Sequence, residues 1–278
     1  MNRLKLKKQL NSSDQCVKFI WETSDSHQIE SLVVIWDDFM SHFCSSTHVG
    51  CNLNCKMCAT SNYPYVRPLQ WSEIADQYIQ MFDLLTPTTL DNQWHFDSIG
   101  EPLNNYEELV KAMNFVRDTI DEDLYCSIST VGVAPKIRQL ADNKLHIKLQ
   151  VSLHAADNET RNALIPINRI YPLEELMSSL DYFSEVTGTW VRLNYTMIKG
   201  VNDERTDLEN LINLLRDRDI ILTLASYNPI PNINLSKSPI EKRDLFKEEL
   251  ENNGIITVVF DSLGLNIEAG CGQLLSPY

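Results

Sequence analysis

Segments typical of strands and segments typical of helices alternate along most of this chain, and this alternation constrains its fold more than any other feature. Runs rich in β-branched and aromatic residues predict strands, and apolar residues spaced three and four apart predict helices. We predict strands at residues 29–36, 94–99, 124–129, 146–153, 190–197, 220–227 and 255–260, and helices at residues 72–85, 106–119, 134–142, 173–183, 205–216 and 240–252. Strands and helices in this order form parallel βαβ units. The sequence therefore predicts an α/β fold.

The number of strand–helix units and the chain length narrow that fold further. The chain has 278 residues, a length at which α/β barrels are often undivided. At least six strand–helix units follow residue 58, which favours an open or partial (β/α)6 barrel over a two-domain dehydrogenase. We predict an N-terminal extension at residues 1–28 and one core domain at residues 29–278. In such barrels the functional residues lie at the C-terminal ends of the strands.

Three of the seven cysteines, Cys51, Cys55 and Cys58, lie within eight residues in the spacing Cys-x3-Cys-x2-Cys. Thiolates are the usual ligands of iron–sulfur clusters. Three thiolates leave one iron of a 4Fe-4S cluster open, which is the arrangement of radical S-adenosylmethionine (SAM) enzymes. Zinc is the main alternative, but a structural zinc site takes four ligands, and His48 is poorly spaced to be the fourth. Three incidental thiols are the remaining interpretation.

Charge and hydropathy indicate the class of partner and the compartment. The formal net charge is −14, so the chain repels a polyanion at long range unless basic residues gather on one face. We find no apolar run of about 18 residues that predicts a membrane span. The N-terminus lacks the apolar stretch of a signal peptide, and clustered cysteines are typical of a reducing compartment. We therefore expect a cytoplasmic protein.

Several motifs around the cysteines resemble the RlmN/Cfr family of radical SAM adenine methyltransferases, which modify ribosomal RNA and, for RlmN, also transfer RNA. The resemblance runs from about residue 29 to residue 274. The matching segments, in order, are Cys44-Ser45-Ser46-Thr47-His48-Val49-Gly50-Cys51, Gly100-Glu101-Pro102, Ser129-Thr130-Val131-Gly132, Ser152-Leu153-His154-Ala155, Tyr227-Asn228-Pro229-Ile230-Pro231 and Glu268-Ala269-Gly270-Cys271-Gly272-Gln273-Leu274. The resemblance implies a radical SAM barrel, a 4Fe-4S cluster and SAM as cofactors, and an electron donor such as flavodoxin or ferredoxin.

The resemblance also implies which residues contact SAM. A carboxylate at a strand end can hold the ammonium group of SAM, and Glu101 matches that position. Considered without the family, the serines and the histidine are more typical of helix caps or buried polar groups than of ligand contacts. The expected SAM contacts are Gly100, Glu101, Ser129, Ser152, Leu153, His154 and Asn228.

Two cysteines outside the triplet match the family's chemistry of methyl transfer. The resemblance implies that Cys271 is methylated by SAM and passes its carbon to an electron-poor amidine carbon of adenine. Cys44 matches the second thiol, which cuts the covalent link to the substrate and forms a disulfide with Cys271 as the product leaves. Glu30 matches the family's proton acceptor when one inserted residue is allowed before Cys44. Cys16 and Cys126 have no match, and we expect both to be structural.

The sequence departs from the family mainly where a substrate is expected to bind. Family members carry an N-terminal accessory domain that helps hold RNA, whereas about 28 residues precede the first matching strand here. The segment at residues 261–270 also lacks the basic residues that usually precede the terminal cysteine, and such residues supply much of the affinity for phosphate. We expect methylation of an adenine carbon in RNA. The alternative is a radical SAM enzyme of the same fold that acts on a nucleotide, small molecule or peptide.

Overall fold

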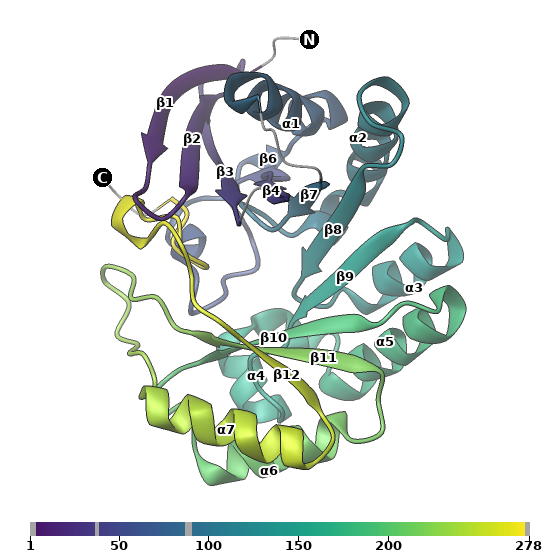
Figure 1. The fold of residues 1–278 in the computed structure, drawn as a ribbon, viewed down its shortest axis with the longest axis vertical. Helices are drawn as coiled ribbons and strands as arrows, with labels where there is room; N and C mark the ends of the chain where they lie inside the picture. The colour runs from purple at the N-terminus through teal and green to yellow at the C-terminus, as the bar shows by residue number, and fades with distance from the viewer. Residues whose placement is uncertain (1–3, 37–38, 87–90, 276–278) are drawn as a thin grey trace. The chain divides into compact units, whose positions relative to one another are not determined.

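The computed structural model describes residues 4–36, 39–86 and 91–275, and the chain falls into two units that we describe separately (Figure 1). The first unit contains Met1–Asn52, Ala59–Ser129 and Leu263–Tyr278. The second unit contains Leu53–Cys58 and Thr130–Ser262. The cysteine triplet lies where the chain passes from one unit to the other along the sequence.

Over its described residues, the first unit is a mixed sheet with two α-helices. Its strand order is β1-β2-β3-β4-β7-β8, with antiparallel pairing from β1 to β4 and parallel pairing from β4 to β8. A separate ladder joins β5 to β6. The strands are β1 (Lys5–Asn11), β2 (Cys16–Glu22), β3 (Gln28–Ile35), β4 (Met40–Cys44), β5 (His48–Val49), β6 (Arg67–Pro68), β7 (Asp91–Phe96) and β8 (Tyr125–Thr130), and the α-helices are α1 (Trp71–Leu85) and α2 (Tyr106–Thr119).

Aromatic packing holds α1 against the parallel strands of the first unit. The ring of Tyr78 on α1 lies 5.1 Å from that of Phe43 on β4 and 5.1 Å from that of Trp94 on β7. All three side chains are fully buried. Aromatic pairs at this separation stabilise a core beyond the area that they bury. The helix thus packs against β4, which ends at Cys44, and against β7, which the Gly-Glu-Pro segment follows.

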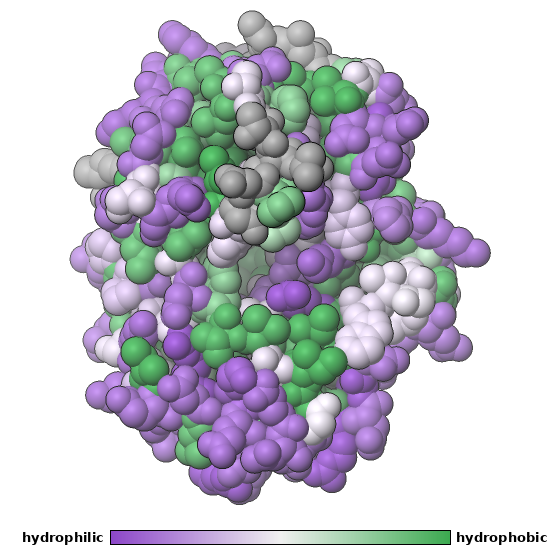
Figure 2. Space-filling view, viewed as in Figure 1, coloured by the Kyte–Doolittle hydropathy of each residue, from purple (hydrophilic) through white to green (hydrophobic). Residues whose placement is uncertain are grey.

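The second unit is a parallel sheet with the strand order β9-β10-β11-β12. Apolar and polar residues alternate along β9, so Ile147, Leu149 and Val151 are buried on one face while Ser152 lies on the other. The elements are β9 (Ile147–Ser152), β10 (Val191–Met197), β11 (Ile220–Ser226), β12 (Ile256–Phe260), α3 (Ala134–Asp142), α4 (Asn158–Leu164), α5 (Leu173–Thr187), α6 (Arg205–Leu215) and α7 (Ile240–Asn252). Helices α6 and α7 present a largely hydrophilic surface to solvent (Figure 2).

Every predicted strand and helix has a counterpart in the structure, and the structure differs from the prediction in four places. Residues 1–28, for which an N-terminal extension and no strand were predicted, contain β1 and β2, which pair with β3. No element was predicted around Cys44, where the structure has β4, and none was predicted at α4. β7 ends at Phe96, three residues earlier than predicted. These are short or edge elements whose sequences carry weak periodicity.

Among the helices that the structure describes, none has the length and apolar character of a membrane span.

Candidate active site

The cysteine triplet lies in a loop that follows β5, and a glycine shapes the start of that loop. Gly50 has φ +75°, and a Cβ at this position would lie 2.2 Å from the carbonyl oxygen of Pro64. A side chain is therefore excluded directly before Cys51. Further along, Lys56 donates its N–H to the carbonyl of Leu164 at 2.9 Å. Close backbone packing thus fixes the loop directly before Cys51, and a backbone hydrogen bond fixes it again directly after Cys55.

The donor chemistry of the triplet fits an iron–sulfur cluster. All three cysteines are free thiols of intermediate exposure. The buried guanidinium of Arg161 interacts electrostatically with Cys55, which favours the thiolate form that binds metal. Over the described ranges, no three His, Cys, Asp or Glu side chains converge on a point where one ion would sit. Ligands of a 4Fe-4S cluster bind separate irons, so this donor set does not need to converge.

The Gly-Glu-Pro segment after β7 forms a turn that packs against the start of the cysteine loop. Gly100 has φ +102°, and a Cβ there would lie 2.4 Å from Nδ1 of His48. Burial lowers the pKa of His48 to about 4, so its ring is neutral at pH 7. Asn105 donates to the carbonyls of Thr47 at 2.9 Å and Leu69 at 2.8 Å. These contacts hold Glu101, a residue that is 4% exposed and whose carboxylate accepts the N–H of Leu103 at 3.1 Å.

In the second unit, a buried arginine fixes the strand end that carries Ser152, Leu153 and His154. Arg161 is fully buried. Its guanidinium donates to the carbonyls of Leu153 at 3.0 Å, Ser152 at 3.0 Å and Val131 at 2.7 Å. A charged, planar fork that satisfies several carbonyls at once is a rigid support. We infer that Arg161 sets the geometry of the Ser-Leu-His segment.

His154 is held as a neutral ring with a defined hydrogen bond. Its backbone has φ +55°. Its Nδ1 accepts the N–H of Thr196 at 3.0 Å, and its carbonyl accepts a hydrogen bond from Asn202 at 2.7 Å. Burial first, and the charge of Arg161 second, lower the pKa of His154 to about 3. Nε2 therefore carries the hydrogen, which leaves a donor for a ligand.

The other two expected SAM contacts also lie near strand ends. Ser129 is the second-last residue of β8 and is half-buried. Asn228 follows β11, is 5% exposed, and donates to the hydroxyl of Ser262 at 2.8 Å. The positions agree with the rule that functional residues of parallel sheets follow the C-terminal ends of strands.

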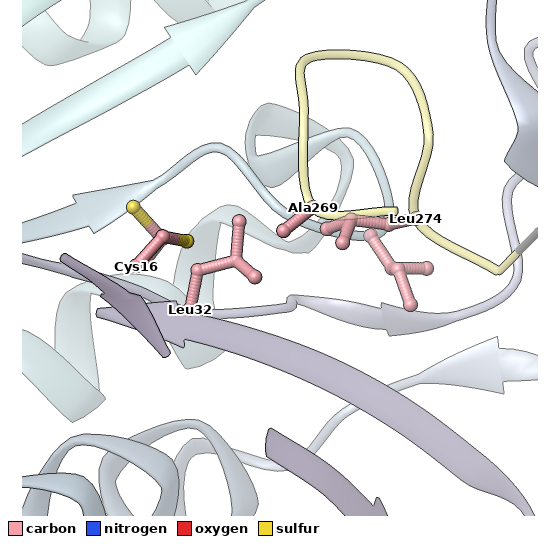
Figure 3. Packing of buried hydrophobic residues seen from close by; sticks show 6 residues of the cluster. Cys16, Leu32, Ala269 and Leu274 are labelled. Carbon is pink, nitrogen blue, oxygen red and sulfur yellow. The ribbon is translucent and has the colours of Figure 1, made fainter. Parts of the chain in front are cut away.

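The three residues expected to carry the methyl-transfer chemistry lie in the first unit and share a region with the C-terminal loop. Cys44 ends β4 and is 6% exposed, and its sulfur interacts electrostatically with Cys271. Figure 3 shows the cluster of buried residues beside it, in which Cys16 and Leu32 face Ala269 and Leu274 of the C-terminal loop. Cys271 itself is exposed. All seven cysteines are free thiols, so the disulfide that the resemblance implies between Cys44 and Cys271 is not formed in this structure.

Hydrogen bonds dock the loop of Cys271 onto the segment that follows the cysteine triplet. The carbonyl of Gly272 accepts the N–H of Ala59 at 2.7 Å, and the carbonyl of Leu274 accepts the hydroxyl of Thr60 at 3.3 Å. Ala59 follows Cys58 directly in the chain. The fold thus ties the proposed methyl carrier to the end of the cluster loop.

Glu30 belongs to a buried ion pair that also contacts the C-terminal loop. Its carboxylate lies 3.0 Å from Nζ of Lys18 and accepts the N–H of Leu275 at 2.9 Å. Lys18 donates in addition to the carbonyl of Glu268 at 3.1 Å. Burial raises the pKa of Glu30, and the ammonium of Lys18 opposes that rise. Glu30 is therefore placed beside Cys271's loop rather than on a distant surface.

Sequence analysis missed two charged residues of this region. Lys18 interrupts the otherwise apolar run of β2, and a lysine in such a run signals a buried partner. Asp97 directly follows β7, two residues after His95, and its carboxylate hydrogen-bonds the thiol of Cys44. The signal for Asp97 was its place at a strand end just before the Gly-Glu-Pro segment.

The chain is similar in sequence to one large enzyme superfamily and to several RNA methyltransferases. Residues 45–215 match the Radical SAM superfamily. The "Probable dual-specificity RNA methyltransferase RlmN" of Caldanaerobacter subterraneus subsp. tengcongensis is 37% identical over 98% of this chain and 80% of its own. The protein of the same name from Thermotoga neapolitana is 36% identical over 97% of this chain and 78% of its own.

The solved structures agree with the sequence relatives. A radical SAM methyltransferase from Sphaerobacter thermophilus superposes with a TM-score of 0.93 at 29% identity, covering 99% of this chain and 82% of that one. Streptococcus suis SuiB bound to S-adenosylmethionine superposes with a TM-score of 0.60 at 15% identity over 81% of this chain and 51% of its own, which shows a shared fold alone. The predicted α/β fold of radical SAM type is confirmed.

Proposed function

The chain belongs to the RlmN family of radical SAM methyltransferases, and we propose that it methylates an sp² amidine-type carbon of adenine in RNA through a methylated Cys271. The single observation that carries the proposal is the gathering of Cys271, Cys44 and Glu30 in one region, in a chain whose near full-length relatives are named RNA methyltransferases. The alternative, a free nucleotide, small molecule or peptide as substrate, is not favoured, because nothing in those relatives' names points to it.

The cofactors of this family are a 4Fe-4S cluster and SAM, which together supply a methyl donor and a 5′-deoxyadenosyl radical when bound. We assign Cys51, Cys55 and Cys58 as cluster ligands and Glu101 as the acceptor for the amino group of SAM. Neutral His154 supplies a hydrogen-bond donor. The other proposed SAM contacts are Gly100, Ser129, Ser152, Leu153 and Asn228.

The remaining roles fall to residues of the first unit. The exposed thiol of Cys271 accepts the methyl group and carries it. Cys44 cuts the covalent link to the product, and Glu30 accepts the proton that leaves the substrate carbon. We propose residues 29–278 as the catalytic core, extended by residues 1–28. Ribosomal or transfer RNA is the proposed substrate, flavodoxin or ferredoxin the electron donor, and the cytoplasm the compartment.

Two measurements on the anaerobically reconstituted protein test this proposal. Intact-mass analysis after incubation with SAM and a chemical reductant should show one added methyl group, absent in Cys271→Ala and retained in Cys126→Ala. Cys126 is the matched control because it is a fully buried cysteine outside the proposed site. Nucleoside mass spectrometry of ribosomal and transfer RNA transcribed in vitro should then show methyladenosine. Cleavage of SAM without methylation of Cys271 would refute the carrier role.

A further inference from the structure

The carboxylate of Asp97 is built into the surroundings of Cys44 by the pairing of two parallel strands. β4 pairs with β7 so that Cys44 lies opposite His95. Side chains of a strand alternate between faces, so Asp97, two residues beyond His95, continues on the side of the sheet that Cys44 shares. There the carboxylate and the thiol form a hydrogen bond. Two residues 53 positions apart in the chain thus meet at adjacent strand ends.

The remaining surroundings of Cys44 keep its sulfur protonated. Its side chain packs among the apolar residues Leu32, Ile99 and Leu274. Burial, followed by the charge of Asp97, raises the pKa of Cys44 well above the ordinary value for a thiol. Only the thiolate is a competent nucleophile in thiol exchange. At neutral pH, Cys44 therefore needs a base before it can attack.

We propose that Asp97 is a catalytic residue, the base that takes the proton from Cys44 when this thiol releases the methylated product from Cys271. The inference rests on the proposed function and deepens it.

In the release step, Cys44 loses its proton and displaces the product from the sulfur of Cys271. The S–H bond of Cys44 breaks, and its proton passes to the carboxylate of Asp97. The sulfur of Cys44 forms a bond to the sulfur of Cys271 as the bond from that sulfur to the product's methylene carbon breaks. The electron pair of the broken bond stays on the carbon, which takes a proton and becomes the methyl group. The two sulfurs are oxidised to a disulfide, and an external thiol or dithiol reductant restores them for the next turnover.

Asp97 has the properties that a base at this position requires. Burial raises its pKa to about 6, although the side chain retains 32% of its surface exposed. It is therefore mostly ionised at pH 7, yet basic enough to hold a proton during the step, and the exposed edge lets that proton leave to solvent. The other carboxylate of the region, Glu30, contacts Lys18 at 3.0 Å and the N–H of Leu275 at 2.9 Å rather than the thiol of Cys44, so its proposed role stays at the substrate carbon.

The titratable groups that face Cys44 and Asp97 decide which ionisations the pH dependence of the release rate reports. Cys44 faces Asp97, Cys16 and Cys271. Asp97 faces Cys44 and, at 3.9 Å from its Oδ2, Nδ1 of His95. His95 stacks on His42 with ring centroids 4.1 Å apart, which fixes the His95 ring. His95 is therefore a positioning residue for the carboxylate of Asp97.

The kinetic test follows release of the protein–RNA adduct in single turnovers of the reconstituted enzyme, with in-vitro-transcribed ribosomal and transfer RNA as the probe. Asp97→Asn should leave methylation of Cys271 intact but slow release about 100-fold, the usual scale of general-base catalysis, and Asp97→Glu should restore part of the rate. The wild-type release rate should rise with pH around the pKa of Asp97. That rise should be absent in Asp97→Asn and retained in His95→Gln. Asp91→Asn, at the exposed start of β7, is the matched control.

An infrared measurement tests the pair without any turnover. The S–H stretching band of Cys44, isolated by comparison of the reconstituted protein with its Cys44→Ala variant, should shift to higher frequency in Asp97→Asn because a neutral amide oxygen accepts the thiol more weakly than a carboxylate does. A band that does not shift, or a release rate and pH profile that are unchanged in Asp97→Asn, overturns the inference. Failure of the wild type to methylate RNA would refute the proposed function instead, and the infrared result would still decide whether the thiol and the carboxylate interact.

Discussion

Replacement of Lys18 by methionine should destabilise the first unit severely, because it leaves a carboxylate buried without its cation. Both side chains of the Lys18–Glu30 pair are at most 2% exposed, and their charged atoms lie 3.0 Å apart. Removing one partner of such a pair costs about 3–5 kcal/mol. Loss of the hydrogen bond from Lys18 to Glu268 adds to this cost, by about 1 kcal/mol.

The same hairpin contains a matched control. Lys7 on β1 also pairs with a glutamate, Glu22, at 3.0 Å, but the side chains are 37% and 28% exposed. Exposed pairs contribute at most about 1 kcal/mol. Lys7→Met should therefore change the free energy of unfolding far less than Lys18→Met, although the two pairs have equal length.

The destabilisation by Lys18→Met should also depend on pH in a defined direction. Burial raises the pKa of Glu30 in the folded protein, and loss of Lys18 raises it further. A carboxyl group with a raised folded pKa binds more protons in the folded state, so stability falls as pH rises from the unfolded pKa through the folded pKa. Lys18→Met should therefore be costlier at about pH 8 than at about pH 5.5, where Glu30 can be protonated.

Urea unfolding of the reconstituted protein, followed by circular dichroism, measures these differences. Lys18→Met/Glu30→Gln is the decisive variant, because it removes the charge that is left unpaired and keeps an acceptor for the N–H of Leu275. It should be more stable than Lys18→Met alone at pH 8. If Lys18→Met costs no more than Lys7→Met, or if the double variant gains nothing at either pH, the buried pair does not contribute as argued.

Three further predictions concern the supports of the proposed SAM contacts. Gly100→Ala should weaken SAM binding in equilibrium dialysis, because the added Cβ meets His48 at 2.4 Å, whereas Gly188→Ala, with a positive φ but open space around it, should not. Arg161→Lys should lower the free energy of unfolding by about 2–4 kcal/mol in urea titrations, because an ammonium cannot reproduce the guanidinium's buried hydrogen bonds. Because burial holds the pKa of His154 at about 3, the unfolded state takes up a proton below about pH 6.5 that the folded state refuses, so stability should fall on acidification. His154→Gln should reduce that slope by up to about 1.4 kcal/mol per pH unit, measured as unfolding free energies across the same range.

The fold was largely predictable because its signals are local. The parallel strands and their helices carry apolar periodicity within each segment, as in β9, where every second residue is buried. β1 and β2 escaped prediction because charge obscures that pattern: lysines line the edge strand β1, where they protect a sheet edge, and Lys18 interrupts β2. β4 has five residues, too few for a period to show.

The site was predictable to the extent that its residues stand in recognisable motifs. Spacing alone indicated the cysteine triplet, and resemblance added Cys44, Cys271 and Glu30. Neither the spacing nor the resemblance could predict Asp97 or Lys18, because the role of each charge depends on a partner that is distant in the sequence and close in the fold. Lys18 finds Glu30 across a hairpin, and Asp97 finds Cys44 across two parallel strands. Such pairings are set by strand register, which a motif does not contain.

The contrast in exposure between the two thiols accounts for the order in which each can act. Cys271 is exposed, so it can accept a methyl group and reach a large substrate. Cys44 is 6% exposed and protonated, so it resists both alkylation by SAM and oxidation, which require an accessible thiolate. Only a sulfur held close to it, such as that of Cys271 when it bears the product, is within its reach. Because it is buried, Cys44 reacts only in the last step, the release of the product from Cys271. The carboxylate of Asp97 activates it there by removing the thiol proton.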